Sequence, residues 1–219
     1  MNELLFLLHV IIITVFTIAA LRLGKEALIA TISIFCILAN LFVLKQITLF
    51  GMHPTGTDAF SVGAILGLNL LQEYFGKNVA KKAIWICFFT LVLYTIVSQI
   101  HLGYAASAHD LLSHHYKAIL KFMPRIVIAS IAVTIFVMFL DRFFYGFLKQ
   151  TFKGKYFLLR SFISVVVIQA IDTVLFTFLG LYGIMSNIWD IILVSMVIKL
   201  ATIAISVPII AAFKGRVKA

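Results

Sequence analysis

The chain has 219 residues, of which 63% are hydrophobic and 12% are charged. Charged residues make up about 25% of an ordinary soluble domain, so this composition excludes that class and predicts an integral membrane protein. The net charge of +10 would suit nucleic acid, but the basic residues lie in short segments between apolar runs. We therefore attribute the charge to membrane topology and contact with anionic lipid, and expect no nucleic-acid partner.

A helix that crosses a bilayer needs about 20 mostly apolar residues. The sequence predicts such helices over residues 4–23, 27–50, 59–75, 83–106, 124–148, 157–182 and 189–212. The expected fold is all-α: a polytopic membrane helix bundle in a single transmembrane domain over 1–219. The first run begins without Lys or Arg and its apolar core is too long for a cleaved signal peptide, so we expect an additional N-terminal helix before a core over about 27–213.

Basic residues are concentrated in alternate connections between these helices. The connections 51–58 and 186–190 contain neither Lys nor Arg, and the long fourth connection holds only Lys117 and Lys121, with Arg125 just beyond. The other connections and the tail hold Arg22, Lys25, Lys77, Lys81, Lys82, Arg142, Lys149, Lys153, Lys155, Arg160, Lys214, Arg216 and Lys218. The positive-inside rule then predicts that the N terminus lies outside and the C terminus in the cytoplasm. We expect a multi-pass protein of the inner (cytoplasmic) membrane.

The sequence offers little for metal or cofactor chemistry. The histidines of the fourth connection lack the spacing and acidic neighbours of a metal site, so we expect a solvated or interfacial loop with a short surface helix there. Cys36 and Cys87 lie in apolar runs and imply no disulfide framework. Because neither a nucleotide-binding P-loop nor a motif of intramembrane enzymes is present, we expect no ATP hydrolysis, no cofactor and no enzymatic activity.

Polar side chains at membrane depth are the informative residues. Ionisable groups there cost about 2.5–3.5 kcal/mol on insertion scales, so they usually face a bundle interior, a partner or a water-filled cavity. The second predicted helix holds Asn40, Lys45 and Gln46, and the third holds Asn69, Gln72 and Glu73. The sixth holds Gln169, Asp172 and Thr173, and the seventh holds Lys199.

The carboxylate of Asp172 lies near the middle of its helix and needs a partner, for which Lys199 is the candidate. The pair could simply fix helix packing, but the rule for intramembrane ionisable residues favours a functional site. Glu73 could instead pair with Lys77 at a helix end, and Lys45 could extend to the interface. The pattern GAILG (63–67) allows close helix approach, either within one chain or in a homodimer.

Three segments resemble the queuosine precursor transporter family, also called the vitamin uptake transporter family. LNLLQEYFGKNVAKKAIW (68–85) is similar to the family's signature, SVVVIQAIDTVLFTFLG (164–180) to its later Asp-Thr segment, and VIKLATIAISVP (197–208) to its final helix. The resemblance covers about residues 31–213. It implies substrate-binding roles for Asn40, Asn69, Gln72, Glu73, Asp172 and Lys199, and Gln169 shares the polar face of Asp172.

Two positions depart from the family pattern, since Asn69 stands where Asp is common and Gln72 where Asn is common. The resemblance implies uptake of 7-deazaguanine bases such as 7-cyano- or 7-aminomethyl-7-deazaguanine, or queuine. Asp172 or Glu73 could accept hydrogen bonds from the guanine-like edge, while Lys, Asn and Gln donate and Phe stacks. A substrate-binding subunit of an energy-coupling vitamin importer remains an alternative, as does a purely structural membrane protein.

Overall fold

The computed structural model describes residues 1–153 and 157–213, with side chains for all of these except 142, 145, 149, 157–162 and 204–213. The described chain is helical, with a short helix α5 (Ser113–Leu120) and a π-helical turn η1 (Thr177–Leu181). The long helices are α1 (Asn2–Leu23), α2 (Lys25–Phe42), α3 (Asp58–Phe75), α4 (Lys77–Leu102), α6 (Met123–Thr151), α7 (Phe157–Phe176) and α8 (Ile188–Phe213). Outside the described side chains lie the basic residues Arg142, Lys149, Lys155, Arg160, Lys214, Arg216 and Lys218.

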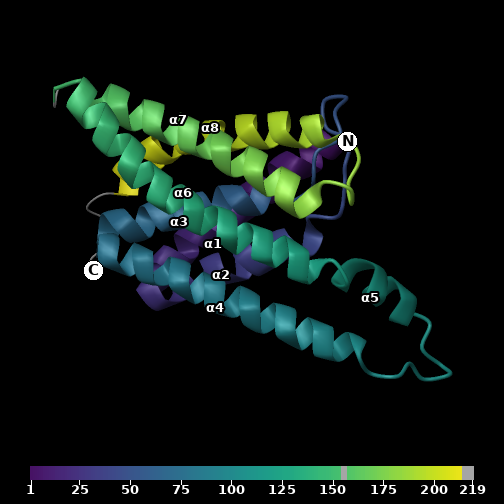
Figure 1. Cartoon of the computed structure of the whole chain (residues 1–219). Coiled ribbons are helices and arrows are strands. Elements are labelled where there is room, and N and C mark those ends of the chain that lie inside the picture. The colour runs from purple at the N-terminus through teal and green to yellow at the C-terminus, as the bar shows by residue number, and fades with distance from the viewer. Residues whose placement is uncertain (154–156, 214–219) are drawn as a thin grey trace.

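The all-helical membrane bundle that the composition predicts is confirmed. Within the described residues, 5 helical stretches are long and apolar enough to cross a membrane. The long helices run in alternate directions between two ends of the molecule (Figure 1). We call the end with the connections 43–57, 103–122 and 182–187 the loop end, and the end with Gly24 and Gly76 the turn end.

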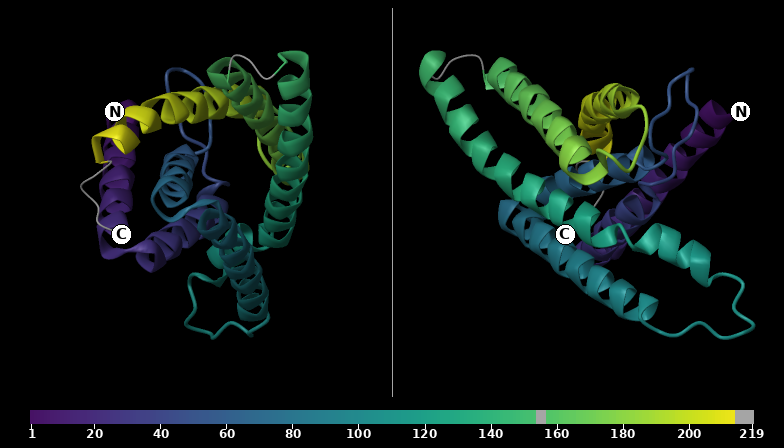
Figure 2. Two further views of the ribbon diagram at one scale, coloured as in Figure 1. Left: turned by 90° about the vertical axis from the view of Figure 1, so that its left-hand side faces the viewer. Right: turned by 45° about the vertical axis from the view of Figure 1, so that its right-hand side comes forward.

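Helix α3 lies inside the bundle. It packs against α1, α2, α4 and α8, and Figure 2 shows these helices arranged around it. Its core contacts include Leu66, Leu70 and Leu71, each no more than 2% exposed. A helix enclosed by protein can carry polar residues that a lipid-facing helix cannot, because neighbouring helices can satisfy them.

Single glycines join α1 to α2 and α3 to α4 at the turn end. Gly24 joins α1 to α2 with φ +111°, and Gly76 joins α3 to α4 with φ +88°. Residues with a Cβ rarely adopt such angles, so glycine allows the chain to reverse within one residue. For this reason α4 begins at Lys77, earlier than the expected 83.

The GAILG pattern serves packing within the chain. A Cβ on Gly63 would collide with the side chains of Ile13 and Phe35, and one on Gly67 would lie 2.6 Å from Cγ1 of Ile32. These two glycines therefore let α1 and α2 approach the backbone of α3 closely, as small residues do in membrane bundles.

The second predicted helix, 27–50, is wrong at its C-terminal end because α2 ends at Phe42. Residues 43–57 instead fold back on themselves, with antiparallel bridges joining Gln46 to Thr55 and Leu49 to Met52. Phe50 and Gly51 have positive φ at the tip of this segment, which a helix cannot accommodate. Lys45 is exposed in this segment, and neither it nor Gln46 lies within a helix.

The side chain of Gln46 fixes the 43–57 segment to the connection between α7 and α8. Its amide nitrogen donates to the backbone oxygen of Ser186 at 2.6 Å, and its amide oxygen accepts from the Ser186 hydroxyl at 2.9 Å. Asp190 adds a contact by accepting from the backbone N–H of His53 at 2.8 Å. These bonds hold the two loop-end connections together.

Candidate functional site

A polar cavity of about 160 Å³ lies between α2, α3, α6, α7 and α8. Charged and amide side chains come from Asn40, Asp172 and Lys199, and hydroxyl groups come from Thr57, Ser61, Ser130 and Thr134. Four apolar residues, Ala39, Val43, Val133 and Phe176, complete the lining. Three of the residues that the sequence places at membrane depth therefore meet in one cavity.

The charged centre of the cavity is the predicted pair of Asp172 and Lys199. Nζ of Lys199 donates to Oδ2 of Asp172 at 2.7 Å and to the hydroxyl of Thr173 at 3.1 Å. The Asp172 side chain retains 24% exposure and the Lys199 side chain retains 14%. This geometry joins α7 to α8 and leaves part of both groups accessible from the cavity.

Asn40 contributes an acceptor that has no partner among the described residues. Its amide nitrogen donates to the backbone oxygen of Cys36 at 2.8 Å, which orients the side chain along α2. Its Oδ1 is buried without a hydrogen bond. Buried polar atoms are rarely left unpaired in native structures, and the exceptions point to a function or to a ligand.

An aromatic ring and an irregular helix end border the cavity on α7. Phe176 lines the cavity and directly precedes the π turn η1. Arg125 of α6 donates to the backbone oxygens of Leu179 at 2.9 Å and Tyr182 at 2.7 Å. Such π-helical turns occur often at functional sites because they redirect side chains and free backbone groups.

The other predicted site residues lie elsewhere in this conformation. Gln72 and Glu73 are exposed near the turn end of α3, and Asn69 is half-buried. Gln72 is eleven positions after Ser61, which is about 16 Å along a helix. Gln169 is half-buried on α7, where its backbone oxygen accepts from Thr173. None of these four residues lines the polar cavity.

Sequence reasoning missed the hydroxyl residues of the cavity and Asp58 beside it. Ser130 and Thr134 are spaced i, i+4 on α6. Isolated hydroxyl residues are weak evidence for a binding site, because they can bond to the backbone of their own helix. Thr134 donates in this way to the backbone oxygen of Ser130. Asp58 begins α3 and is only 4% exposed. The sequence signal was the acidic first residue of an apolar helix, which is also typical of an ordinary helix start.

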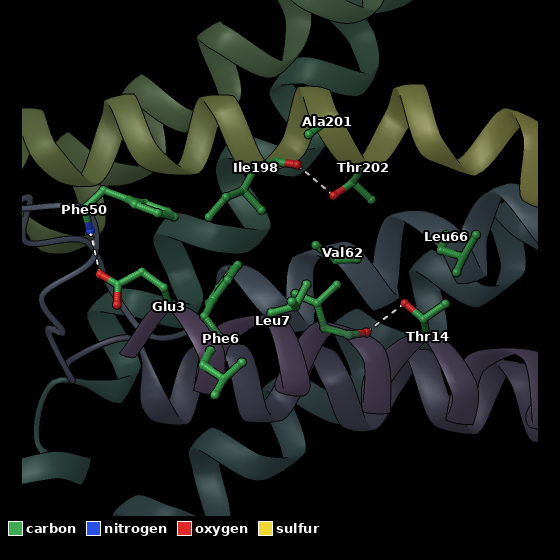
Figure 3. Close-up of a pocket in the computed structure, with 12 residues that line it drawn as sticks. Glu3, Phe6, Leu7, Thr14, Phe50, Val62, Leu66, Ile198, Ala201 and Thr202 are labelled. Carbon is green, nitrogen blue, oxygen red and sulfur yellow. Dashed lines mark hydrogen bonds between the residues drawn. The ribbon is translucent and has the colours of Figure 1, made fainter. Parts of the chain in front are cut away.

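A larger groove between α1 and α8 is apolar and differs in character from this cavity (Figure 3). It measures about 670 Å³. Its polar groups are occupied, since Thr14 and Thr202 bond to backbone oxygens of their own helices and Glu3 accepts from the N–H of Phe50. A polar solute would find few partners there, so size alone does not make this groove the functional site.

A bundle of membrane-length helices around a small charged cavity defines an integral membrane protein with polar and charged side chains in its interior. Residues 54–213 match the family model described as "Putative vitamin uptake transporter". The chain is also 33% identical over 190 residues to the "Probable queuosine precursor transporter" of Bacillus subtilis (strain 168), covering 84% of this chain and 82% of that protein. No solved structure matches the chain.

The chain therefore belongs to the vitamin uptake transporter family. The resemblance noted in the sequence is confirmed, and the protein is a membrane transporter and not an enzyme.

Proposed function

We propose that this transporter takes up queuosine precursors, 7-deazaguanine bases, through the polar cavity. The proposal rests on one observation. The ion pair of Asp172 and Lys199 lines the same cavity as Asn40, whose Oδ1 has no hydrogen-bond partner among the described residues. The name of the Bacillus subtilis relative supports the substrate class.

The ring chemistry of a 7-deazaguanine is complementary to these groups. Its N1–H and exocyclic amine lie on one edge and can donate together to the two oxygens of a carboxylate, which we assign to Asp172. The adjacent ring carbonyl can accept from Lys199, a remaining N–H can donate to Asn40, and Phe176 can stack on the flat ring. In this scheme the substrate replaces the direct bond between Asp172 and Lys199.

The size of the cavity favours a small ligand. Sites for drug-sized molecules usually measure about 300–1,000 Å³, whereas this cavity encloses about 160 Å³. We infer that transport requires the site to open toward each end of the bundle in turn. Asn69, Gln72 and Glu73 remain predicted substrate contacts, at a separate position along α3 nearer the turn end.

The membrane and orientation are part of the proposal. We place the protein in the inner membrane with the turn end in the cytoplasm, because Arg22, Lys25, Lys77, Lys81 and Lys82 flank the two glycine connections. The C terminus would then be cytoplasmic and the N terminus outside. Fusions of a reporter that is active on only one side of the membrane, made at each terminus, test this orientation.

Rescue of queuosine in transfer RNA tests the transport proposal. The host would be a bacterium without its own precursor synthesis and transporter, supplied with one base at a time at low concentration, and queuine would also require an enzyme that inserts it. We expect rescue by the unmodified protein and loss of rescue in Asp172→Ala at equal membrane abundance. Asp141→Asn is the matched control, because this helix carboxylate bonds to Ser164 outside the cavity.

Two results would overturn parts of the proposal. Full rescue by Asp172→Ala would refute the role of the cavity while leaving transport intact. No rescue by any base, with the protein present in the membrane, would refute the substrate class and favour the importer-subunit alternative. Co-purification of a separate ATPase and a coupling protein would then support that alternative.

A further inference from the structure

Asp58 is a buried carboxylate that the substrate scheme does not use. It is the first residue of α3, its side chain is 4% exposed, and it does not line the polar cavity. Its Oδ2 has no hydrogen-bond partner among the described residues. An unpaired carboxylate oxygen inside a membrane bundle is costly and therefore indicates a function or an additional partner.

The neighbours of Asp58 connect it to the charged centre of the cavity. The hydroxyl of Ser195 and the ammonium of Lys199, both on α8, are polar neighbours of the Asp58 carboxyl group. Ser195 and Lys199 are four residues apart, so they lie on the same face of α8. Lys199 is already bonded to Asp172 and Thr173 on the other side. The same ammonium therefore bonds to one carboxylate and acts electrostatically on a second.

The other charged or titratable groups near Asp58 do not balance its charge. No ion pair joins Asp58 to a described residue, and Lys45 of the 43–57 segment is exposed. The other titratable groups on the elements packed around the start of α3 are His9, His53 and Asp190. His9 of α1 lies edge-on against the ring of Phe60. Asp190 accepts a hydrogen bond from the backbone N–H of His53. With both carboxylates ionised, the cluster of Asp58, Asp172 and Lys199 carries a formal charge of −1.

A proton is the cation that best fits this position. The helix N terminus supplies only about half a positive charge, which is not enough to neutralise the cluster. An alkali ion would require several oxygen ligands around it at the same time. A proton on Oδ2 requires only the oxygen that has no partner.

We propose that Asp58 binds a proton that moves into the cell together with the substrate. This inference rests on the proposed function, because it describes what drives the same transport step. A proton from the loop-end side occupies Oδ2 of Asp58 and makes the cluster neutral, so that the helices can rearrange around a neutral site. The proton leaves Asp58 for the cytoplasm when the site opens at the turn end.

Transport by the purified protein in liposomes tests the inference with labelled 7-cyano-7-deazaguanine, 7-aminomethyl-7-deazaguanine and queuine. An inward proton gradient of one pH unit can drive accumulation of up to about tenfold when one proton accompanies each neutral substrate. We expect the unmodified protein to accumulate substrate and to lose this accumulation when a protonophore is added. Asp58→Asn should exchange labelled for unlabelled substrate at equilibrium but give no accumulation, with or without the gradient.

The controls separate this inference from the proposed function. Asp110→Asn changes an exposed carboxylate of the loop-end connection and should accumulate substrate like the unmodified protein. Gradient-driven accumulation in Asp58→Asn, or accumulation by the unmodified protein that ignores the gradient, would overturn the role of Asp58. Absence of exchange by the unmodified protein for all three bases would instead refute the substrate assignment.

Infrared spectroscopy tests the proton on Asp58 without any substrate. Lowering the pH should produce carbonyl stretches from several protonated carboxyl groups of the purified protein, and one of these bands should be missing in Asp58→Asn but retained in Asp110→Asn. A spectrum in which Asp58→Asn removes no such band would overturn the inference, whatever the transport substrate is.

Discussion

Replacing Lys199 by Met tests whether the charged pair contributes to both stability and transport. Met has a similar length and can fill the same space, but it leaves the Asp172 carboxylate without the ammonium that lies 2.7 Å away. Removing one partner of a buried ion pair costs about 3–5 kcal/mol. Because the Asp172 side chain keeps 24% exposure, we expect the lower end, about 3 kcal/mol, or roughly a hundredfold in the unfolding equilibrium.

Unfolding of the purified protein in detergent measures this loss, and the queuosine rescue assay measures transport in parallel. The exchanged pair D172K/K199D distinguishes the two roles, since it restores opposite charges but places the carboxylate on α8. We expect it to recover most of the lost stability and little of the transport. Unchanged stability of Lys199→Met would refute the energetic argument, and full transport by the exchanged pair would show that the pair only fixes packing.

Three further substitutions test the packing, the loop-end contacts and the unpaired amide. Gly63→Leu should lower the thermal stability, because overpacking costs about 1–3 kcal/mol. Gly146→Ala should not lower it, because Gly146 has open space for a Cβ. Equal stability of the two variants would contradict the close approach of α1 and α2 to α3. Gln46→Ala should speed hydrogen exchange in residues 43–57 by removing the bonds to Ser186, and unchanged exchange would show that these bonds do not hold the segment. Asn40→Leu should abolish rescue at normal membrane abundance, while retained rescue would remove Oδ1 from the site.

The sequence alone determined the class of the protein and most of its helices. A membrane helix must satisfy its backbone internally and present about 20 apolar residues to lipid, so composition and run length are sufficient evidence. The same reasoning identified Asn40, Asp172 and Lys199, since polar groups at membrane depth require partners wherever the helices place them. The pairing of Asp172 with Lys199 followed because few other charges were available to balance either of them.

The tertiary structure decided which polar residues share a site. The position of a residue along a helix gives its depth in the membrane only when the ends of the helix are known. Lys45 and Gln46 were expected in the second helix but lie in the 43–57 segment that follows it. Helix α3 placed Gln72 about 16 Å along its axis from Ser61, while its first residue, Asp58, came to lie against α8. Contacts between helices distant in sequence depend on side-chain packing, which local patterns do not encode, so the site could be assembled only from the fold.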